Sequence, residues 1–127
     1  MICEDTMSKS VLVVEDDENS MILFVELLQA KGFETLQAGD GMEGLKLARE
    51  HVPDLVIMDI QLPDISGLEV TRKIKEDEKL RDIPIIAVTA YALRGDEEAC
   101  RKAGCVGYIA KPISINDFNE AVDKHIG

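Results

Sequence analysis

Aromatic residues are scarce in this chain of 127 residues. Tryptophan is absent, and Phe and Tyr together make up 4% of the sequence. Hydrophobic residues nevertheless reach 46%, more than a disordered chain carries, so we expect one domain with an aliphatic core. No apolar run approaches the roughly 20 residues that a membrane-spanning helix needs. The chain also does not open with a signal-peptide pattern, and we therefore expect a cytoplasmic protein without membrane contacts.

Basic residues are outnumbered by acidic ones. The chain has 14 Lys and Arg residues against 25 Asp and Glu residues, which gives a formal net charge of −11. Such a charge repels a phosphate backbone, which argues against direct binding of nucleic acid.

Cysteine and histidine are few. Cys3, Cys100 and Cys105 show no spacing typical of a disulfide framework or a zinc site. We therefore expect reduced thiols, two of them small packing residues of the core. His51 and His125 lack ligand-like neighbours and are expected at helix ends.

The sequence does have a regular alternation of apolar strands and amphipathic helices. Buried strands are predicted at 11–14, 55–58 and 85–88, a more polar edge strand at 33–38 and a short strand at 107–110. Helices are predicted at 19–31, 40–51, 66–76 and 94–103, with a last helix carrying Ile115, Phe118, Val122 and Ile126 on one stripe. This order predicts an α/β fold, a doubly wound parallel sheet of five strands between two layers of helices.

Local signals indicate where several elements begin and end. Asp40 with Glu43, and Ser66 with Glu69, are typical of helix N-terminal capping, and Gly32 is typical of a helix C-terminus. Residues 1–8 show little periodicity and are expected to be a flexible leader to a domain at 9–127. The helix at 94–103 has few apolar residues to bury and is expected to be the weakest.

Chemically reactive residues follow the apolar strands. These are Glu15 and Asp16 after the first strand, Asp59 after the third, Thr89 after the fourth and Lys111 after the fifth. The carboxyl ends of parallel strands lie along one edge, so we expect these groups to converge. Neighbouring carboxylates raise one another's pKa, and Mg²⁺ relieves that repulsion. With a hydroxyl and an ammonium group opposite, the site suits phosphoryl transfer onto a carboxylate, with Asp59 as the first candidate.

The motifs at these strand ends resemble those of the receiver domain of two-component response regulators. They are Val-Val-Glu-Asp-Asp at 13–17, Met-Asp-Ile-Gln-Leu-Pro-Asp-Ile-Ser-Gly at 58–67, Val-Thr-Ala at 88–90 and Ala-Lys-Pro-Ile at 110–113. The resemblance spans about 10–126 and implies a CheY-like, flavodoxin-like sandwich with strand order 2-1-3-4-5. The tract 83–98 is similar to stand-alone receivers of the DivK type and to receivers of hybrid histidine kinases.

The resemblance also implies roles for the acidic residues. Asp59 would be the phosphoacceptor. Asp16, Asp59 and the backbone carbonyl of Gln61 would bind Mg²⁺, and Glu15 would act through a water molecule. Asp17 falls outside this set and is expected to begin a helix.

Further roles follow for residues around the phosphoryl group. Lys111 would pair with it, and the peptide bond between Lys111 and Pro112 is expected to be cis. Thr89 would donate its hydroxyl to a phosphoryl oxygen, and Tyr108 would rotate inward behind it as the second switch residue. Gln61 and Tyr91 occupy the positions that tune the lifetime of the phosphoryl group in this family.

The resemblance implies a function in phosphorelay signalling, with no turnover of a separate substrate and hence no enzyme in the usual sense. The donor would be a histidine kinase or a histidine phosphotransfer protein. A downstream protein would bind the face formed by the fourth helix, the fifth strand and the last helix of a monomer or weak dimer. Two alternatives remain: a receiver excised from a hybrid histidine kinase, or an interaction module independent of phosphorylation.

Three other protein classes fit less well. A haloacid-dehalogenase-like phosphatase would carry its acceptor after the first strand and a second Asp where Gln61 stands. In a flavodoxin, the acidic segment 15–17 would repel the flavin phosphate. The phosphate-binding loop of P-loop NTPases is absent from the sequence.

Overall fold

The computed structural model describes residues 9–90 and 96–126. Within these residues, five parallel strands form one sheet in the order β2-β1-β3-β4-β5, as predicted. The strands are β1 (Ser10–Val14), β2 (Glu34–Ala38), β3 (Leu55–Asp59), β4 (Ile85–Thr89) and β5 (Gly107–Ala110). The polar strand β2 lies at an edge of the sheet, while β3 and β4 are buried throughout. The predictions of a polar edge strand and of buried strands at 55–58 and 85–88 are therefore confirmed.

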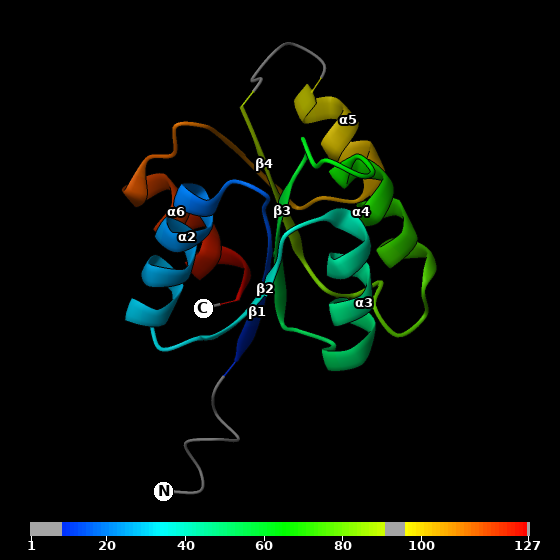
Figure 1. Cartoon of the computed structure of the whole chain (residues 1–127), viewed down its shortest axis with the longest axis horizontal. Coiled ribbons are helices and arrows are strands. Elements are labelled where there is room, and N and C mark those ends of the chain that lie inside the picture. Colours follow the sequence, from blue (N-terminus) through cyan, green and yellow to red (C-terminus); the bar gives the residue numbers. More distant parts are fainter. Residues whose placement is uncertain (1–8, 91–95, 127) are drawn as a thin grey trace, which may run out of the picture.

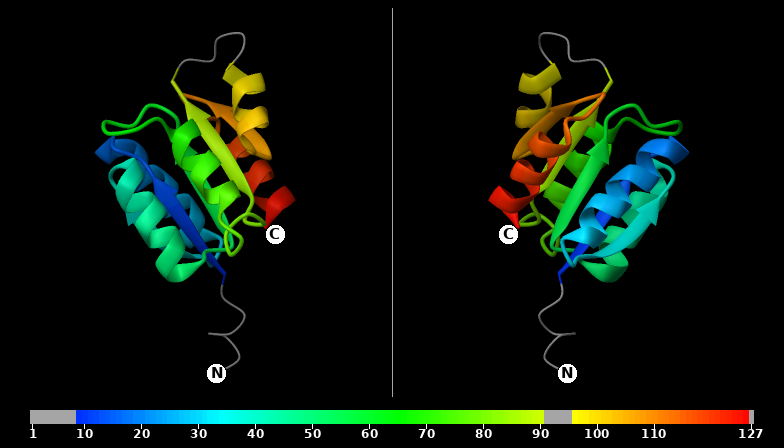
Figure 2. Two further views of the ribbon diagram at one scale, coloured as in Figure 1. Left: turned by 90° about the vertical axis from the view of Figure 1, so that its right-hand side faces the viewer. Right: turned by 90° about the vertical axis from the view of Figure 1, so that its left-hand side faces the viewer.

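Helices cover both faces of the sheet and complete the three predicted layers (Figure 1). One face carries α2 (Glu18–Ala30) and α6 (Ile115–His125), and the other carries α3 (Gly41–His51), α4 (Gly67–Glu76) and α5 (Asp96–Ala103). The two side views in Figure 2 show the strands running in one direction, so their carboxyl ends share one edge. No helix in these described ranges is both long and apolar enough to cross a membrane.

Alternation along the strands divides the core between the two faces. Leu12 and Met58 pack toward α3 and α4, whereas Val13 and Ile57 pack toward α2 and α6. Burying an aliphatic side chain of this size stabilises the fold by about 1.5–3 kcal/mol, which favours strands that are apolar on both faces. On the face of the sheet covered by α2 and α6, Phe24 of α2 stacks on Phe118 of α6 with ring centroids 5.3 Å apart.

Side-chain caps begin the helices near the predicted positions. Asp40 caps α3 by accepting from the Glu43 backbone N–H at 2.8 Å, and Ser66 caps α4. Asp17 caps α2 and accepts from the Ser20 backbone N–H, which confirms its expected place at a helix start. Gly32 follows α2 with φ of +92°, a conformation that glycine adopts without strain and that ends the helix.

The last helix, α6, differs from the prediction in one detail. Ile115 was expected on the buried stripe of α6, but this prediction is wrong because its side chain is 52% exposed. Ile115 is the first residue of α6. Ile113, which precedes the Ser114 cap and lies outside the helix, packs against the core instead. The predicted helix at 94–103 corresponds to α5, and its first residues fall in 91–95, outside the described residues.

Candidate functional site

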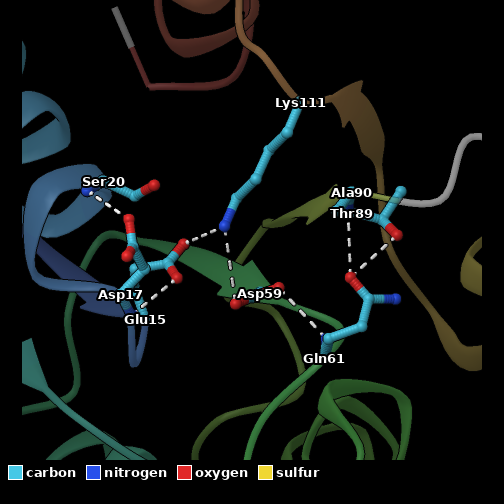
Figure 3. A network of polar contacts seen from close by, with 8 residues as sticks. All are labelled: Glu15, Asp17, Ser20, Asp59, Gln61, Thr89, Ala90 and Lys111. Atoms are coloured by element: carbon cyan, nitrogen blue, oxygen red, sulfur yellow. Dashed lines mark hydrogen bonds and ion pairs between the residues drawn. The ribbon is translucent and has the colours of Figure 1, made fainter.

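The ends of β1, β3, β4 and β5 bring the predicted reactive side chains together (Figure 3). Glu15 follows β1, Asp59 ends β3, Thr89 ends β4 and Lys111 follows β5. Register places Asp59 beside Val88 of β4, whereas Thr89 is paired with β5. The topology therefore gathers residues up to 96 positions apart in the sequence, from 15 to 111, at one edge of the sheet.

Lys111 lies between two buried carboxylates. Its Nζ is 2.9 Å from Glu15 Oε1 and 3.7 Å from Asp59 Oδ2. Glu15 is 2% exposed and Asp59 3%, so both charges depend on this ammonium group and on nearby hydrogen bonds. The second Glu15 oxygen accepts from the backbone N–H of Asp17 at 3.1 Å.

This arrangement shifts the pKa of Asp59 and that of Lys111. Burial, a hydrogen bond with Glu15 and the charge of Glu15 together raise the pKa of Asp59 to about 7, although the charge of Lys111 and the backbone N–H of Gln61 oppose the shift. Burial lowers the pKa of Lys111, but its hydrogen bond with Glu15 and the charges of Asp59 and Glu15 outweigh burial, so the net shift is upward. One cation thus serves two buried acids, which leaves the site short of positive charge.

A third carboxylate joins this pair at the surface. Ligand oxygens of Glu15, Asp16 and Asp59 all lie within 4.8 Å of one another, and Asp16 is exposed. An all-oxygen set of carboxylates suits a hard divalent cation such as Mg²⁺. Because Asp59 holds its proton up to about pH 7 when only Lys111 balances it, a cation at this cluster would favour the ionised carboxylate. The residues therefore fit a magnesium site.

The loop after β3 holds Asp59 in place. The backbone N–H of Gln61 donates to Asp59 Oδ1 at 3.0 Å, and the backbone N–H of Gly67 donates to the Ile60 carbonyl at 2.9 Å. A Cβ on Gly67 would collide with the Asp59 carbonyl oxygen. Helix α4 can begin this close to β3 because its first residue, Gly67, has no side chain.

Two side chains of this loop make contacts that sequence reasoning missed. The Gln61 amide oxygen accepts from Thr89 Oγ1 and from the Ala90 backbone N–H, each at 3.1 Å. The Asp64 carboxylate accepts from the backbone N–H groups of Gly41 and Met42 at 2.8 and 2.9 Å, at the start of α3. These hydrogen bonds hold the pKa of Asp64 below its usual value. No local signal identifies either contact, because the partners are 22 to 29 residues apart.

The remaining predicted residues have mixed outcomes. The peptide bond between Lys111 and Pro112 is cis, as expected. Thr89 is fully buried, and Tyr108 lies in β5, partly buried against the core beneath α3, α4 and α5. Tyr91 lies outside the described residues.

Comparison with known proteins gives consistent results. A family model described as the response regulator receiver domain matches residues 11–123. The polar-differentiation response regulator DivK of Brucella ovis is 56% identical over 121 residues, covering 95% of this chain and 98% of that protein. DivK of Brucella anthropi is 55% identical over the same length.

Solved structures agree in fold. The receiver domain of a sensor histidine kinase from Pseudomonas aeruginosa, with a magnesium ion coordinated in its active-site cleft, is 33% identical with a TM-score of 0.87. The match covers 94% of this chain and 98% of that one. A CheY-like receiver domain protein from Methanospirillum hungatei is 28% identical, also with a TM-score of 0.87, over 94% of each chain. With its acidic cluster, its Lys111 and its sheet order, this chain belongs to the response regulator receiver domain family of two-component signalling.

Proposed function

We propose that this receiver accepts a phosphoryl group on Asp59 from a phosphohistidine of a histidine kinase or a histidine phosphotransfer protein. The observation that carries the proposal is the position of Asp59 at the end of β3, within 3.7 Å of Lys111 Nζ and within the cluster of three carboxylates. The kinase-borne receiver from Pseudomonas aeruginosa supports it by analogy in family and fold.

In the proposed transfer, a carboxylate oxygen of Asp59 forms a bond to phosphorus as the phosphorus–nitrogen bond of the donor breaks. The electron pair of that bond leaves with the imidazole, and the product is an acyl phosphate. Lys111 is close enough to turn from Asp59 toward the new phosphoryl group and offset its charge. Thr89, at the end of β4, would donate its hydroxyl to a second phosphoryl oxygen.

Magnesium would be held by Asp16, Asp59 and the backbone carbonyl of Gln61, with Glu15 contributing through water. When bound, it supplies positive charge against the transferring phosphoryl group. Burial and the neighbouring Glu15 raise the pKa of Asp59. The positive charge of the metal would oppose this shift and favour the ionised Asp59 carboxylate at neutral pH.

The response would pass to the face formed by α5, β5 and α6, where a downstream protein would bind. Among the helices described, α5 is the shortest, with eight residues, and its buried side chains are those of Cys100 and Ala103. A helix with so little buried surface is easily displaced. Thr89 and Tyr108 lie on the two neighbouring strands next to it and would change position together.

Intact mass after incubation with acetyl phosphate and Mg²⁺ tests this function. The parent should gain one phosphoryl group that neutral hydroxylamine removes, and Asp59→Asn should gain none. Asp54→Asn is the matched control, because Asp54 precedes the same strand at its opposite end and binds the Ser10 backbone N–H. Asp16→Asn, or a chelator, should slow labelling. A phosphoryl group retained by Asp59→Asn would falsify the assignment.

A further inference from the structure

The side chain of Gln61 joins the acceptor loop to the end of β4. Its amide oxygen accepts from the Thr89 hydroxyl and from the Ala90 backbone N–H, both at 3.1 Å (Figure 3). Its own backbone N–H donates to Asp59 Oδ1 at 3.0 Å. One residue therefore contacts both the proposed phosphoacceptor and the proposed switch residue.

Two donors that converge on one oxygen form a small site for an acceptor oxygen. The Gln61 amide oxygen is neutral, and its hydrogen bonds are of ordinary strength. A phosphoryl group on Asp59 brings strongly accepting, negatively charged oxygens next to Gln61. Hydrogen bonds to a charged acceptor are stronger than those to an amide. Transfer of the Thr89 hydroxyl from the Gln61 amide oxygen to a phosphoryl oxygen is therefore favourable.

We propose that the Gln61 amide oxygen is a built-in competitor of the phosphoryl group. It holds the Thr89 hydroxyl and the Ala90 backbone N–H in the unphosphorylated protein, and the phosphoryl group must displace it before the switch can move. This inference rests on the proposed function of Asp59. Gln61 is thus a positioning residue that acts through Thr89: its hydrogen bonds stabilise the resting arrangement and raise the threshold for switching.

The competitor has a measurable consequence for binding of a phosphoryl mimic. Removing the amide oxygen of Gln61 destabilises the resting state, in which Thr89 and Ala90 donate to it, and leaves the phosphorylated state unaffected. The net worth of one neutral hydrogen bond corresponds to roughly a fivefold change in an equilibrium constant. Beryllofluoride, at saturating Mg²⁺, should therefore bind Gln61→Ala and Gln61→Leu about fivefold more tightly than the parent. Leu keeps most of the bulk of Gln without its acceptor, so agreement between the two variants separates hydrogen bonding from crowding.

Two further measurements address the contact itself. In the absence of beryllofluoride, the Ala90 amide should exchange with solvent faster in both Gln61 variants than in the parent, as followed by NMR. When Thr89→Ala is combined with Gln61→Leu, the gain in beryllofluoride affinity should shrink, because one of the two displaced donors is already missing. The matched control is Gln29→Ala on α2, since the exposed side chain of Gln29 donates to Thr35 Oγ1, far in the sequence from Thr89 and Ala90. It should change neither quantity.

Each result decides the proposal. Unchanged or weaker beryllofluoride binding in both Gln61 variants overturns it, and so does a gain confined to Gln61→Ala, which would reflect lost bulk. If the parent is phosphorylated on Asp59 and binds beryllofluoride normally, such results remove the competitor and leave the proposed function intact. If the parent binds no beryllofluoride and Asp59→Asn retains the phosphoryl label, both proposals fail.

Discussion

At the scale of the residue, Asp59 is a buried carboxyl group at the proposed site of phosphorylation. A carboxyl group that is 3% exposed loses most of its hydration, and the adjacent Glu15 adds a second negative charge. Lys111 offsets part of this cost, yet its nearer partner is Glu15. The pKa of Asp59 is consequently raised from 3.8 to about 7, so the proton is held near neutral pH until a cation or a phosphoryl group changes the balance.

This shift predicts how stability depends on pH in the absence of Mg²⁺. The folded state holds the Asp59 proton up to about pH 7, and the unfolded state releases it near 3.8. Between these values the folded state binds more protons, so this group makes the free energy of unfolding fall as pH rises and adds no further change above about 7. Asp59→Asn should remove this decline and be more stable than the parent at about pH 8.

Urea denaturation in the presence of a chelator, at about pH 5.5 and about pH 8, measures the effect. The difference between the two pH values should be smaller in Asp59→Asn than in the parent. Adding Mg²⁺ at the higher pH should restore stability to the parent, because a ligand of the folded state stabilises it. Equal pH dependence in parent and variant would contradict the raised pKa.

At the scale of the element, α4 positions the end of β3, where Asp59 lies. Ser66 caps the helix, and its first residue, Gly67, donates its backbone N–H to the Ile60 carbonyl. The absence of a Cβ lets this turn approach the Asp59 carbonyl. The inner face of α4 then buries Val70 and Ile74 completely, so the position of the helix and that of the site are coupled.

Gly67→Ala should therefore destabilise the domain by about 1–3 kcal/mol, the usual cost of overpacking a well-filled site. Gly39→Ala is the matched control, because its nearest neighbour would lie 4.0 Å from the new Cβ and no steric clash is expected. Urea midpoints compare the two variants. The labelling of Asp59 by acetyl phosphate should also slow in Gly67→Ala, since the colliding atom belongs to the Asp59 backbone. Equal midpoints for both variants would show that α4 can shift without cost.

At the scale of the whole molecule, the sheet connects the site to the proposed output face. Thr89 ends β4, which pairs with β3 on one side and with β5 on the other. A displacement of Thr89 toward Asp59 would therefore affect β5, Tyr108 and the neighbouring α5. An acyl phosphate on Asp59 would bias this equilibrium only through contacts that differ between the two states, and in the proposed mechanism these are chiefly contacts with Thr89 and Lys111.

Hydrogen exchange with and without beryllofluoride tests this connection. Changes in protection in the parent should concentrate in residues 96–112 and should be clearly smaller in Thr89→Ala, although we expect that variant still to accept phosphate on Asp59. A charge-assisted hydrogen bond of about 1.5–3 kcal/mol is enough to shift an equilibrium with a gap of a few kcal/mol. Thr35→Ala on the edge strand β2 serves as control and should respond like the parent. Equal changes in all three proteins would assign the switch to Lys111 instead.

The sequence by itself determined the fold and the membership of the site. Apolar strands of four or five residues, helices with local caps and short connections predict a parallel sheet, and parallel strands place Glu15, Asp59, Thr89 and Lys111 at one edge. These features are local, or follow from chain direction, so pattern alone recovers them. The motifs added the strand order and the cis peptide bond, both of which agree with the structure.

The tertiary structure alone decided which side chains meet at that edge. Lys111 contacts Glu15 more closely than Asp59, Gln61 bonds to Thr89, and Ile115 is left exposed. None of these outcomes follows from a periodicity or a motif, because each depends on the geometry of loops and on the packing of residues that are far apart in the sequence. Such choices are settled only when the whole core has packed, since the free energies that separate the alternatives are about as small as one hydrogen bond.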